Sequence, residues 1–356
     1  MDDQFVHELP KLELHVHIEG TLTPELRWQL AQKNGVHLPY DSLDALRSSY
    51  QTMYNHRKEL HGDNGLPTFL EAYYGGMEVL HKEDDFYELA MQYLRKASSM
   101  HVRYAEPFFD IQAHTRRNIP VAAVMEGLKR AKADAARELD VHCNWILCFL
   151  RDMSPESAMQ AYEACIPYKG TVFCGIGLDS NEYNRPPTLF DAVFQRARAD
   201  GLKITSHCDV GQKDTHAHIE QVASRIAGHG TDRIDHGLNA AERPDLIELI
   251  RRRDLGMTLC PHAYHRRNPT DYVFPLVRKL FDAGIKVTVN SDDPTYMHNM
   301  WVEDNLRLVQ QHCQFTRREM IRLQMHAVEI SWCGPDLKGK LMDELTRFDQ
   351  VWGDQL

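Results

Sequence analysis

The sequence predicts an α/β fold of the (β/α)8 (TIM-barrel) type. Eight short apolar runs rich in β-branched residues recur along the 356 residues, and each is followed by a stretch with helical periodicity. Apolar strands that alternate with helices indicate a parallel sheet covered by helices, and eight repeats in a chain of this length favour closure into a barrel. An open doubly wound sheet is the alternative. The first run lacks the GxGxxG turn typical of such sheets and ends in His-x-His instead.

The expected strands are residues 12–18, 102–109, 141–150, 171–178, 202–207, 233–238, 257–260 and 286–290. Helical patterns follow at residues 121–138, 155–164, 189–200, 217–227, 244–253 and 273–283, and Ser, Pro or Asp opens several of them. Residues 24–100 hold about four helical segments and no strand, which predicts a helical insertion capping the barrel mouth after strand one. Residues 301–347 predict a C-terminal helical tail. With no internal repeat or long linker, residues 1–356 are expected to form a single domain.

Composition excludes several classes of protein. With 43% hydrophobic and 26% charged residues and no long apolar run, the chain is typical of a soluble globular protein without a membrane span. A net charge of −10 disfavours nucleic acid as a partner. The N-terminal residues lack a secretory signal and the eight cysteines form no CxxC pair, so a cytoplasmic protein with reduced thiols is expected. A small-molecule substrate fits this composition, and assembly into a homo-oligomer stays open.

Histidine and aspartate gather where the expected strands end. His15 and His17 end the first run, His207 the fifth and His236 the sixth, and Asp292 follows the eighth. Residues i and i+2 of a strand point the same way, and the carboxyl ends of barrel strands form one rim. A lone His-x-His pair is weak evidence, because hydrogen-bonded histidines at a strand end would give the same pattern. Agreement among separate strand ends favours a metal site.

The chain resembles a known family at these positions. PKLELHVHIEGTLTPE, RIDHG and VTVNSDDP are similar to motifs of the adenosine/adenine deaminase branch of the amidohydrolase superfamily, and EPFFDIQAHT, GIGLDSNE and CGPDLKGKL follow in similar order and spacing. The resemblance covers nearly the whole chain. It implies that His15, His17, His207 and Asp292 bind a metal. It also implies that His236 lies beside the metal-bound water and that Asp293 contacts the substrate ring.

The implied chemistry is a hydrolytic deamination. One Zn²⁺, or another divalent transition metal, lowers the pKa of a bound water from 15.7 to about 7 and so supplies hydroxide at neutral pH. Hydroxide attacks an electrophilic ring carbon and ammonia leaves. His236 is expected to help take the proton of the water and to stabilise the oxygen. Asp292 is expected to orient the water and to carry a proton towards the leaving amine.

The sequence departs from the family pattern after His207. The family has His-Ala-Gly-Glu there, and its glutamate protonates a ring nitrogen of the substrate. In this chain Val210 takes the place of that acid, and valine cannot donate a proton. Three alternatives stay open: Asp209 replaces the acid, the substrate needs no ring protonation, or catalysis is lost while the metal is kept. For Asp209, a carboxylate bound to local amides is as good an interpretation as a catalytic one.

Three further features bear on the substrate. The usual Cys-Pro-x-Ser-Asn stretch is replaced over residues 260–267 by CPHAYHRR, which predicts either a loop contacting the substrate, with an anionic group as one option, or a solvated turn. Glu19 occupies the position where the resembling nucleoside deaminases have Asp, and the longer side chain favours a free base over a nucleoside. Glu182 is a candidate ring contact, with an ordinary loop carboxylate as the alternative.

The leading hypothesis is a metal-dependent aminohydrolase that releases ammonia from an adenine-like purine base or a related aminated heterocycle. A metal hydrolase of another C–N bond, in a non-purine or N-substituted amine, is the alternative within enzymes. A metal-binding relative without turnover is the alternative outside them.

Overall fold

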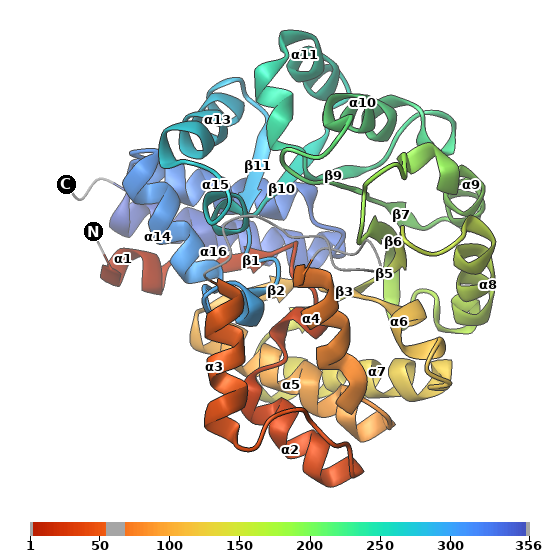
Figure 1. Ribbon diagram of the computed structural model, residues 1–356. Coiled ribbons are helices and arrows are strands. Elements are labelled where there is room, and N and C mark those ends of the chain that lie inside the picture. The colour runs from red at the N-terminus through yellow and green to blue at the C-terminus, as the bar shows by residue number, and fades with distance from the viewer. Residues whose placement is uncertain (1–2, 55–67, 354–356) are drawn as a thin grey trace.

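The computed structural model describes residues 3–54 and 68–353 and has the predicted α/β barrel. Its strands fall into three hydrogen-bonded groups, β1-β2-β4, β3-β5-β6-β7 and β11-β10-β9-β8, and every pairing between named strands is parallel. In Figure 1 the strands lie around the centre of the molecule and the helices form a ring outside them. The strands are β1 Lys11–Glu13, β2 Val102–Ala105, β3 Phe108–Phe109, β4 His142–Cys143, β5 Trp145–Leu150, β6 Phe173–Asp179, β7 Lys203–Ile204, β8 His207–Cys208, β9 Arg233–His236, β10 Gly256–Leu259 and β11 Lys286–Val289.

Several expected strands are interrupted. The run predicted at 102–109 is split into β2 and β3 around Pro107, which has no N–H to donate to a ladder. The run at 12–18 is regular only over β1, because the next amide, that of Leu14, donates to the side chain of Asn290 (2.8 Å) instead of to a backbone carbonyl. The runs at 141–150 and 202–207 are likewise each divided into two strands. Within residues 3–54 and 68–353, the eleven strands therefore correspond to the eight predicted runs.

The first and last strands close the barrel through residues of the predicted metal site. Val16 and Asp292 form an isolated parallel bridge. Within it, the amide of His17 donates to the carbonyl of Asp292 (2.9 Å) and the amide of Asp292 donates to the carbonyl of His15 (3.1 Å). His17 also bridges to Phe108 on the other side. The same backbone that closes the barrel thus sets the positions of three candidate ligands.

Helices that follow the strands cover the outside of the barrel (Figure 1). Sequence signals account for where they begin. In α8, for example, the hydroxyl of Ser154 accepts from the amide of Ser157, and Pro155 occupies the first turn. The helices of this outer ring are α5 Glu83–Ser99, α7 Val121–Glu138, α8 Pro155–Cys165, α9 Asp191–Ala199, α10 Thr215–Ser224, α11 Pro244–Arg252, α13 Thr270–Asp282 and α15 Arg317–Ile330.

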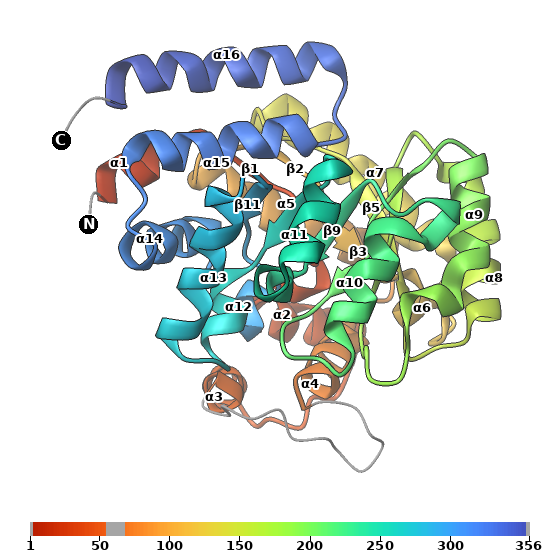
Figure 2. The same cartoon turned by 90° about the horizontal axis from the view of Figure 1, so that it is seen from above.

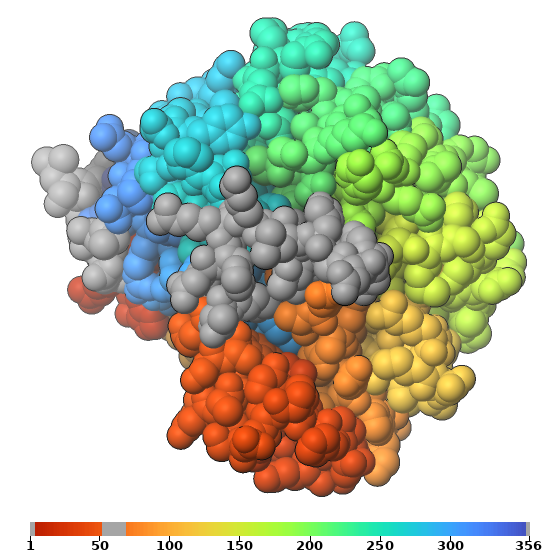
Figure 3. All heavy atoms as spheres, viewed as in Figure 1, coloured from red at the N-terminus to blue at the C-terminus, as the bar shows by residue number. Residues whose placement is uncertain are grey.

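Among its described residues, the segment 24–100 consists of helices joined by short loops and contains no strand. Helices α2 Pro24–Asn34, α3 Leu43–Tyr54 and α4 Thr68–Gly76 precede α5, and they form the lower part of the face shown in Figure 3, opposite the green and cyan segments. At the other end of the chain come α14 Val302–His312 and α16 Pro335–Trp352, and α16 lies over α15 on the outer side of the molecule (Figure 2). Three short helices complete the fold, α1 Asp3–Glu8, α6 Ile111–Thr115 and α12 Pro261–His265, together with single 3-10 turns.

No helix within residues 3–54 or 68–353 combines the length and apolar character needed to cross a bilayer.

Candidate active site

The three histidines predicted as metal ligands converge on one point at the carboxyl rim of the barrel. Nε2 of His17 lies 3.1 Å from Nε2 of His207, and each pair of rings among the three histidines lies within 5.6 Å between centroids. Nε2 atoms of His15 and His17 are each 3.6 Å from Oδ1 of Asp292. Ligands 2.0–2.1 Å from a tetrahedral zinc ion are about 3.3 Å apart, so these distances suit a shared ion.

Neighbouring side chains orient the other ring nitrogen of each histidine. The hydroxyl of Thr258 donates to Asp235 (2.9 Å) and therefore accepts from Nδ1 of His15 (2.9 Å). A carboxylate oxygen of Asp235 also lies 3.5 Å from Nδ1 of His207. Asp179 lies 3.4 Å from Nδ1 of His17. A carboxylate or hydroxyl partner on Nδ1 directs the Nε2 lone pair into the site, as in many protein metal centres.

The donor set fits a transition-metal ion. Nε2 of His15 is buried without a hydrogen-bond partner among the described residues, which is costly unless a ligand occupies it. Burial lowers the pKa of all three histidines, that of His17 to about 4, so the rings are neutral and free to coordinate. Burial alone would raise the pKa of Asp292, but the electrostatic influence of the imidazole rings around it, those of His15, His236 and His17, holds it well below its ordinary value. Three imidazoles and one carboxylate suit zinc.

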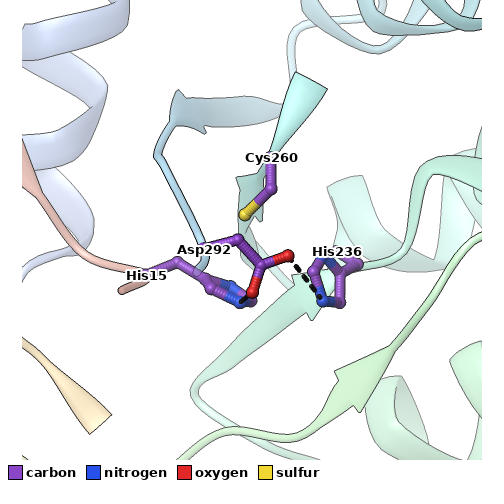
Figure 4. Close-up of side chains that lie close together, drawn as sticks. All are labelled: His15, His236, Cys260 and Asp292. Atoms are coloured by element: carbon purple, nitrogen blue, oxygen red, sulfur yellow. Dashed lines mark ion pairs between the residues drawn. The ribbon is translucent and has the colours of Figure 1, made fainter. Parts of the chain in front are cut away.

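Asp292 lies between His15 and His236 (Figure 4). Its Oδ2 is 3.9 Å from Nε2 of His236, and the thiol of Cys260 belongs to the same compact group. Burial raises the pKa of Cys260 far above neutrality, so this sulfur is a protonated thiol and a poor ligand. His236 and Asp292 both have left-handed backbone conformations, with φ of 60° and 66°, which are uncommon for residues other than glycine and recur at functional sites.

A cavity of about 450 Å³ opens onto this rim. Of the predicted residues, it is lined by His17, Glu182, His207, Asp209, His236, Asp292 and Asp293, and Val210 also lines it. Aromatic side chains from α4, Tyr73 and Tyr74 among them, form part of its wall. A cavity that combines an aromatic wall with convergent ionisable groups suits a small polar molecule.

Asp293 points into the cavity beside Asp292, and its place depends on a glycine. A Cβ at Gly20 would collide with the carboxylate of Asp293, so this close approach requires a residue without a side chain. Burial and the adjacent charge of Asp292 raise the pKa of Asp293. A protonated Asp293 can donate to a ring nitrogen of a bound base as well as accept from an N–H.

Glu19 does not line the cavity. Its Oε1 accepts from the amide of Asp110 (3.1 Å) and lies 2.8 Å from Nε2 of His114, and its side chain is 1% exposed. Burial raises the pKa of Glu19 to about 7. The structure thus places Glu19 behind the cavity wall, where it supports Asp110, whose side chain does line the cavity.

Glu182 lines the cavity, but its carboxylate is engaged by the protein. Arg151, fully buried, contacts Oε2 of Glu182 (2.9 Å) and donates to the carbonyl of His207 (2.9 Å). Oε1 of Glu182 accepts from the amide of Asp209 (2.7 Å). The Arg151–Glu182 pair therefore binds the backbone before and after Cys208, at the carbonyl of His207 and the amide of Asp209.

Asp209 and Val210 follow β8 at the position of the missing acid. Arg267 donates to both carboxylate oxygens of Asp209, and the amide of Val210 donates to Oδ1 (2.7 Å). Although burial opposes it, the charge of Arg267 holds the pKa of Asp209 below its ordinary value. Val210 is 4% exposed and contributes an apolar side chain to the cavity wall.

The stretch predicted as a loop at 262–267 is largely helical, because Pro261 begins the short helix α12. Tyr264 is fully buried, whereas Arg266 and Arg267 line the cavity. The alternative prediction of a solvated turn is therefore wrong for Tyr264. Its hydroxyl reaches the ring of His236, at 2.9 Å from Nδ1.

Asp110 and Asp179 were missed by the sequence reasoning, although both sit at strand ends. Asp110 follows β3 and Asp179 ends β6, and the two carboxyls meet beside His17. Burial raises the pKa of both groups, and the charge of Asp110 raises that of Asp179 further. The rule that identified His207 and Asp292, applied to every strand end, would have found this pair.

Comparisons with known proteins agree with this geometry. A family model described as adenosine deaminase matches residues 10–348. The chain is 42% identical over 350 residues to an uncharacterized deaminase of Schizosaccharomyces pombe, covering 98% of each protein. It is 37% identical over 343 residues to an adenine deaminase of Rhodospirillum rubrum, covering 96% of this chain and 97% of the relative. The crystal structure of an adenine deaminase from Arthrobacter aurescens has a TM-score of 0.85 at 33% identity and covers 96% of this chain and 99% of that one.

Proposed function

Because the chain belongs to the adenosine deaminase family, we propose that it is a zinc-dependent aminohydrolase that converts an adenine-like purine base to its oxo product and ammonia. The resemblance found from its motifs is confirmed, and the protein is a metal-dependent deaminase of purine bases. The observation that carries the assignment is the convergence of His15, His17, His207 and Asp292 at the end of a cavity. Zinc is the metal that this donor set favours.

His15, His17, His207 and Asp292 would hold the ion. A bound divalent metal of this kind lowers the pKa of water from 15.7 to about 7 and so makes a nucleophile available at neutral pH. Two roles then fall to the chain: to move the proton of the water and to hold the base with its amino-bearing carbon facing the rim.

Asp292 is the proton carrier. Its Oδ2 faces His236 and its Oδ1 faces the ligand histidines, so the carboxylate spans the space where water and substrate meet. It accepts a proton from water as the oxygen bonds to the ring carbon. It returns that proton to the amine as the C–N bond breaks, and ammonia leaves. Asp293, which lies beside it, would form a hydrogen bond with a ring nitrogen of the base.

Val210 bears on which bases are substrates. The wall at this position is apolar, and the nearest carboxylate, Asp209, is bound by Arg267 on both oxygens. A ring nitrogen here receives no proton from residue 210. This favours substrates whose amino-bearing carbon is electrophilic without that proton, and it supports the second candidate function, hydrolysis of an N-substituted amine on a related ring.

Ammonia release tests the proposal. Metal-loaded protein is offered adenine, adenosine, N6-substituted adenines and other aminated heterocycles, with His207→Ala as the inactive comparison. We expect turnover of a free base to exceed that of its nucleoside. Turnover only of N-substituted amines would support the second function, and no ammonia from any amine would refute both. Val210→Glu should raise the rate on adenine if the missing acid limits it, by up to about 10²–10⁴-fold.

A further inference from the structure

The hydroxyl of Tyr264 connects the helix after β10 to the ring of His236. Oη lies 2.9 Å from Nδ1 of His236, and it accepts a hydrogen bond from the amide of Cys260, also at 2.9 Å. Tyr264 is fully buried. It occupies the stretch where this chain departs from the usual Cys-Pro-x-Ser-Asn pattern, with Ala263 and Tyr264 in the last two places.

The direction of these hydrogen bonds follows from counting protons. An amide N–H is always the donor, so Cys260 uses one lone pair of the hydroxyl. If Nδ1 of His236 also carried a proton, it would use the second lone pair, and the proton of Tyr264 would be left without an acceptor. No other acceptor for this hydroxyl is found among residues 3–54 and 68–353. A buried donor without a partner is disfavoured, so the hydroxyl donates to Nδ1.

We propose that Tyr264 is a positioning residue that fixes His236 in the tautomer with its proton on Nε2, so that His236 donates a hydrogen bond to the attacking oxygen and does not take its proton. Nε2 is the nitrogen that faces Asp292 (Figure 4). The N–H is therefore aimed at the place where negative charge builds on oxygen as it bonds to the ring carbon.

This division of roles leaves Asp292 as the proton acceptor. With its proton on Nε2 and Nδ1 occupied by Tyr264, His236 has no free lone pair facing the rim. The expectation from the sequence that His236 helps to take the proton is thereby replaced by one in which it only stabilises the oxygen. This consequence for catalysis rests on the proposed function, whereas the tautomer itself does not.

Tyr264→Phe removes the hydroxyl and keeps the ring. The ionisable groups around His236, apart from Tyr264 itself, are His15, His17, His207, Asp209, Cys260 and Asp292, and none of them is changed by this variant. The matched control is Tyr162→Phe, which removes a tyrosine hydroxyl that donates to Asp200 away from the cavity.

The deciding measurement is the tautomer. Long-range ¹H–¹⁵N spectra of the zinc-loaded, ¹⁵N-histidine-labelled protein distinguish protonated from unprotonated ring nitrogens, and the signals of His236 are identified by their loss in His236→Gln. We expect Nε2 protonated and Nδ1 unprotonated in the wild type and in Tyr162→Phe, and a mixture of tautomers in Tyr264→Phe. A proton on Nδ1 in the wild type overturns the proposal, whatever the substrate, and this spectrum decides even if Tyr264→Phe does not fold.

Kinetics test the consequence. We expect Tyr264→Phe to lower kcat by about 10–100-fold, the usual effect of removing such an outer partner, with KM, zinc content and Tm close to those of Tyr162→Phe. An unchanged kcat in Tyr264→Phe overturns the catalytic role of the tautomer. A wild type that shows the expected tautomer but deaminates nothing refutes the proposed function and confirms the hydrogen bond.

Discussion

The guanidinium of Arg267 donates to both carboxylate oxygens of Asp209, at 2.9 Å to Oδ1 and 2.8 Å to Oδ2. Both side chains are largely buried, with 14% and 21% of their surface exposed. With its pKa held low by this cation, Asp209 is ionised at neutral pH and has no proton to give. The pair joins β8 to the segment after α12 and anchors Arg267 in the cavity wall.

Asp209→Asn should therefore lower kcat less than about tenfold, because loss of a general acid costs about 10²–10⁴-fold. Asp209→Asn and Arg267→Gln should each lower the free energy of unfolding by about 1–3 kcal/mol, since each breaks a charged hydrogen-bonded pair. The double variant should lose less than the sum of the two. Ammonia release measures kcat, and urea unfolding measures the free energy of unfolding. A drop of kcat by a hundredfold or more at unchanged stability would instead make Asp209 the acid.

Removing a metal ligand should remove the metal. His207→Ala removes one of the three imidazole donors of the proposed site, so bound zinc after dialysis and ammonia release should both fall to background. Elemental analysis of the dialysed protein measures the metal. His216→Ala is the control, because His216 is 37% exposed and pairs with Glu242 away from the rim. A fully zinc-loaded His207→Ala would contradict the assignment of the site.

The buried Arg151–Glu182 pair should be costly to break. Arg151→Met leaves the carboxylate of Glu182, 2% exposed, without its cation, and we expect the free energy of unfolding to fall by about 3–5 kcal/mol. Arg151→Met combined with Glu182→Met should cost less than Arg151→Met alone, because no buried charge is left over. Equilibrium unfolding in urea measures all three proteins. An equal loss of unfolding free energy in the single and double variants would mean that the unpaired carboxylate of Glu182 is not the cause of the loss.

Stability should depend on pH through Glu19. Burial raises its pKa from 4.5 to about 7 in the folded protein, whereas the unfolded chain releases this proton near the lower value. Between these pH values unfolding releases a proton, so the free energy of unfolding falls as the pH rises, by about 3 kcal/mol in all. The stabilisation that protonated Glu19 gives the folded protein is fully present below pH 4.5 and is lost as the pH rises through 7.

Glu19→Gln removes this titration and keeps an oxygen that accepts from the amide of Asp110. Urea unfolding measures the free energy of unfolding of wild type and variant at several pH values between 4 and 8. The difference between the two free energies should change by about 3 kcal/mol over this range. Two curves that stay parallel across this range would show that the carboxyl of Glu19 titrates normally in the folded protein.

The fold was predictable because each strand is a short apolar run and each run ends in polar residues. The breaks within strands were not, since they depend on contacts between distant segments, such as the bond from the amide of Leu14 to the side chain of Asn290. Like the fold, the candidate ligands His15 and Asp292 could be proposed from the sequence, because they stand at strand ends. A residue's position on a strand decides which way its side chain points.

The roles of Glu19, Glu182 and Tyr264 could not be predicted from local pattern. Glu19 and Glu182 each lie near the rim, but the partners that engage them, His114 and Arg151, come from other parts of the chain. The sequence marked Tyr264 only as part of a stretch that departs from the usual Cys-Pro-x-Ser-Asn motif. Its contact with His236 depends on how α12 packs against the end of β9, and no spacing rule gives that distance.

The bridge between Val16 and Asp292 ties the first strand of the barrel to the last. A chain still emerging from the ribosome has all three candidate histidines once residue 207 has been made, but it lacks Asp292 and the strand that brings His15 and His17 into line. A metal site at these residues would therefore form only after Asp292 has been made and has paired with the first strand. Retention of metal would then report that these two distant segments have met.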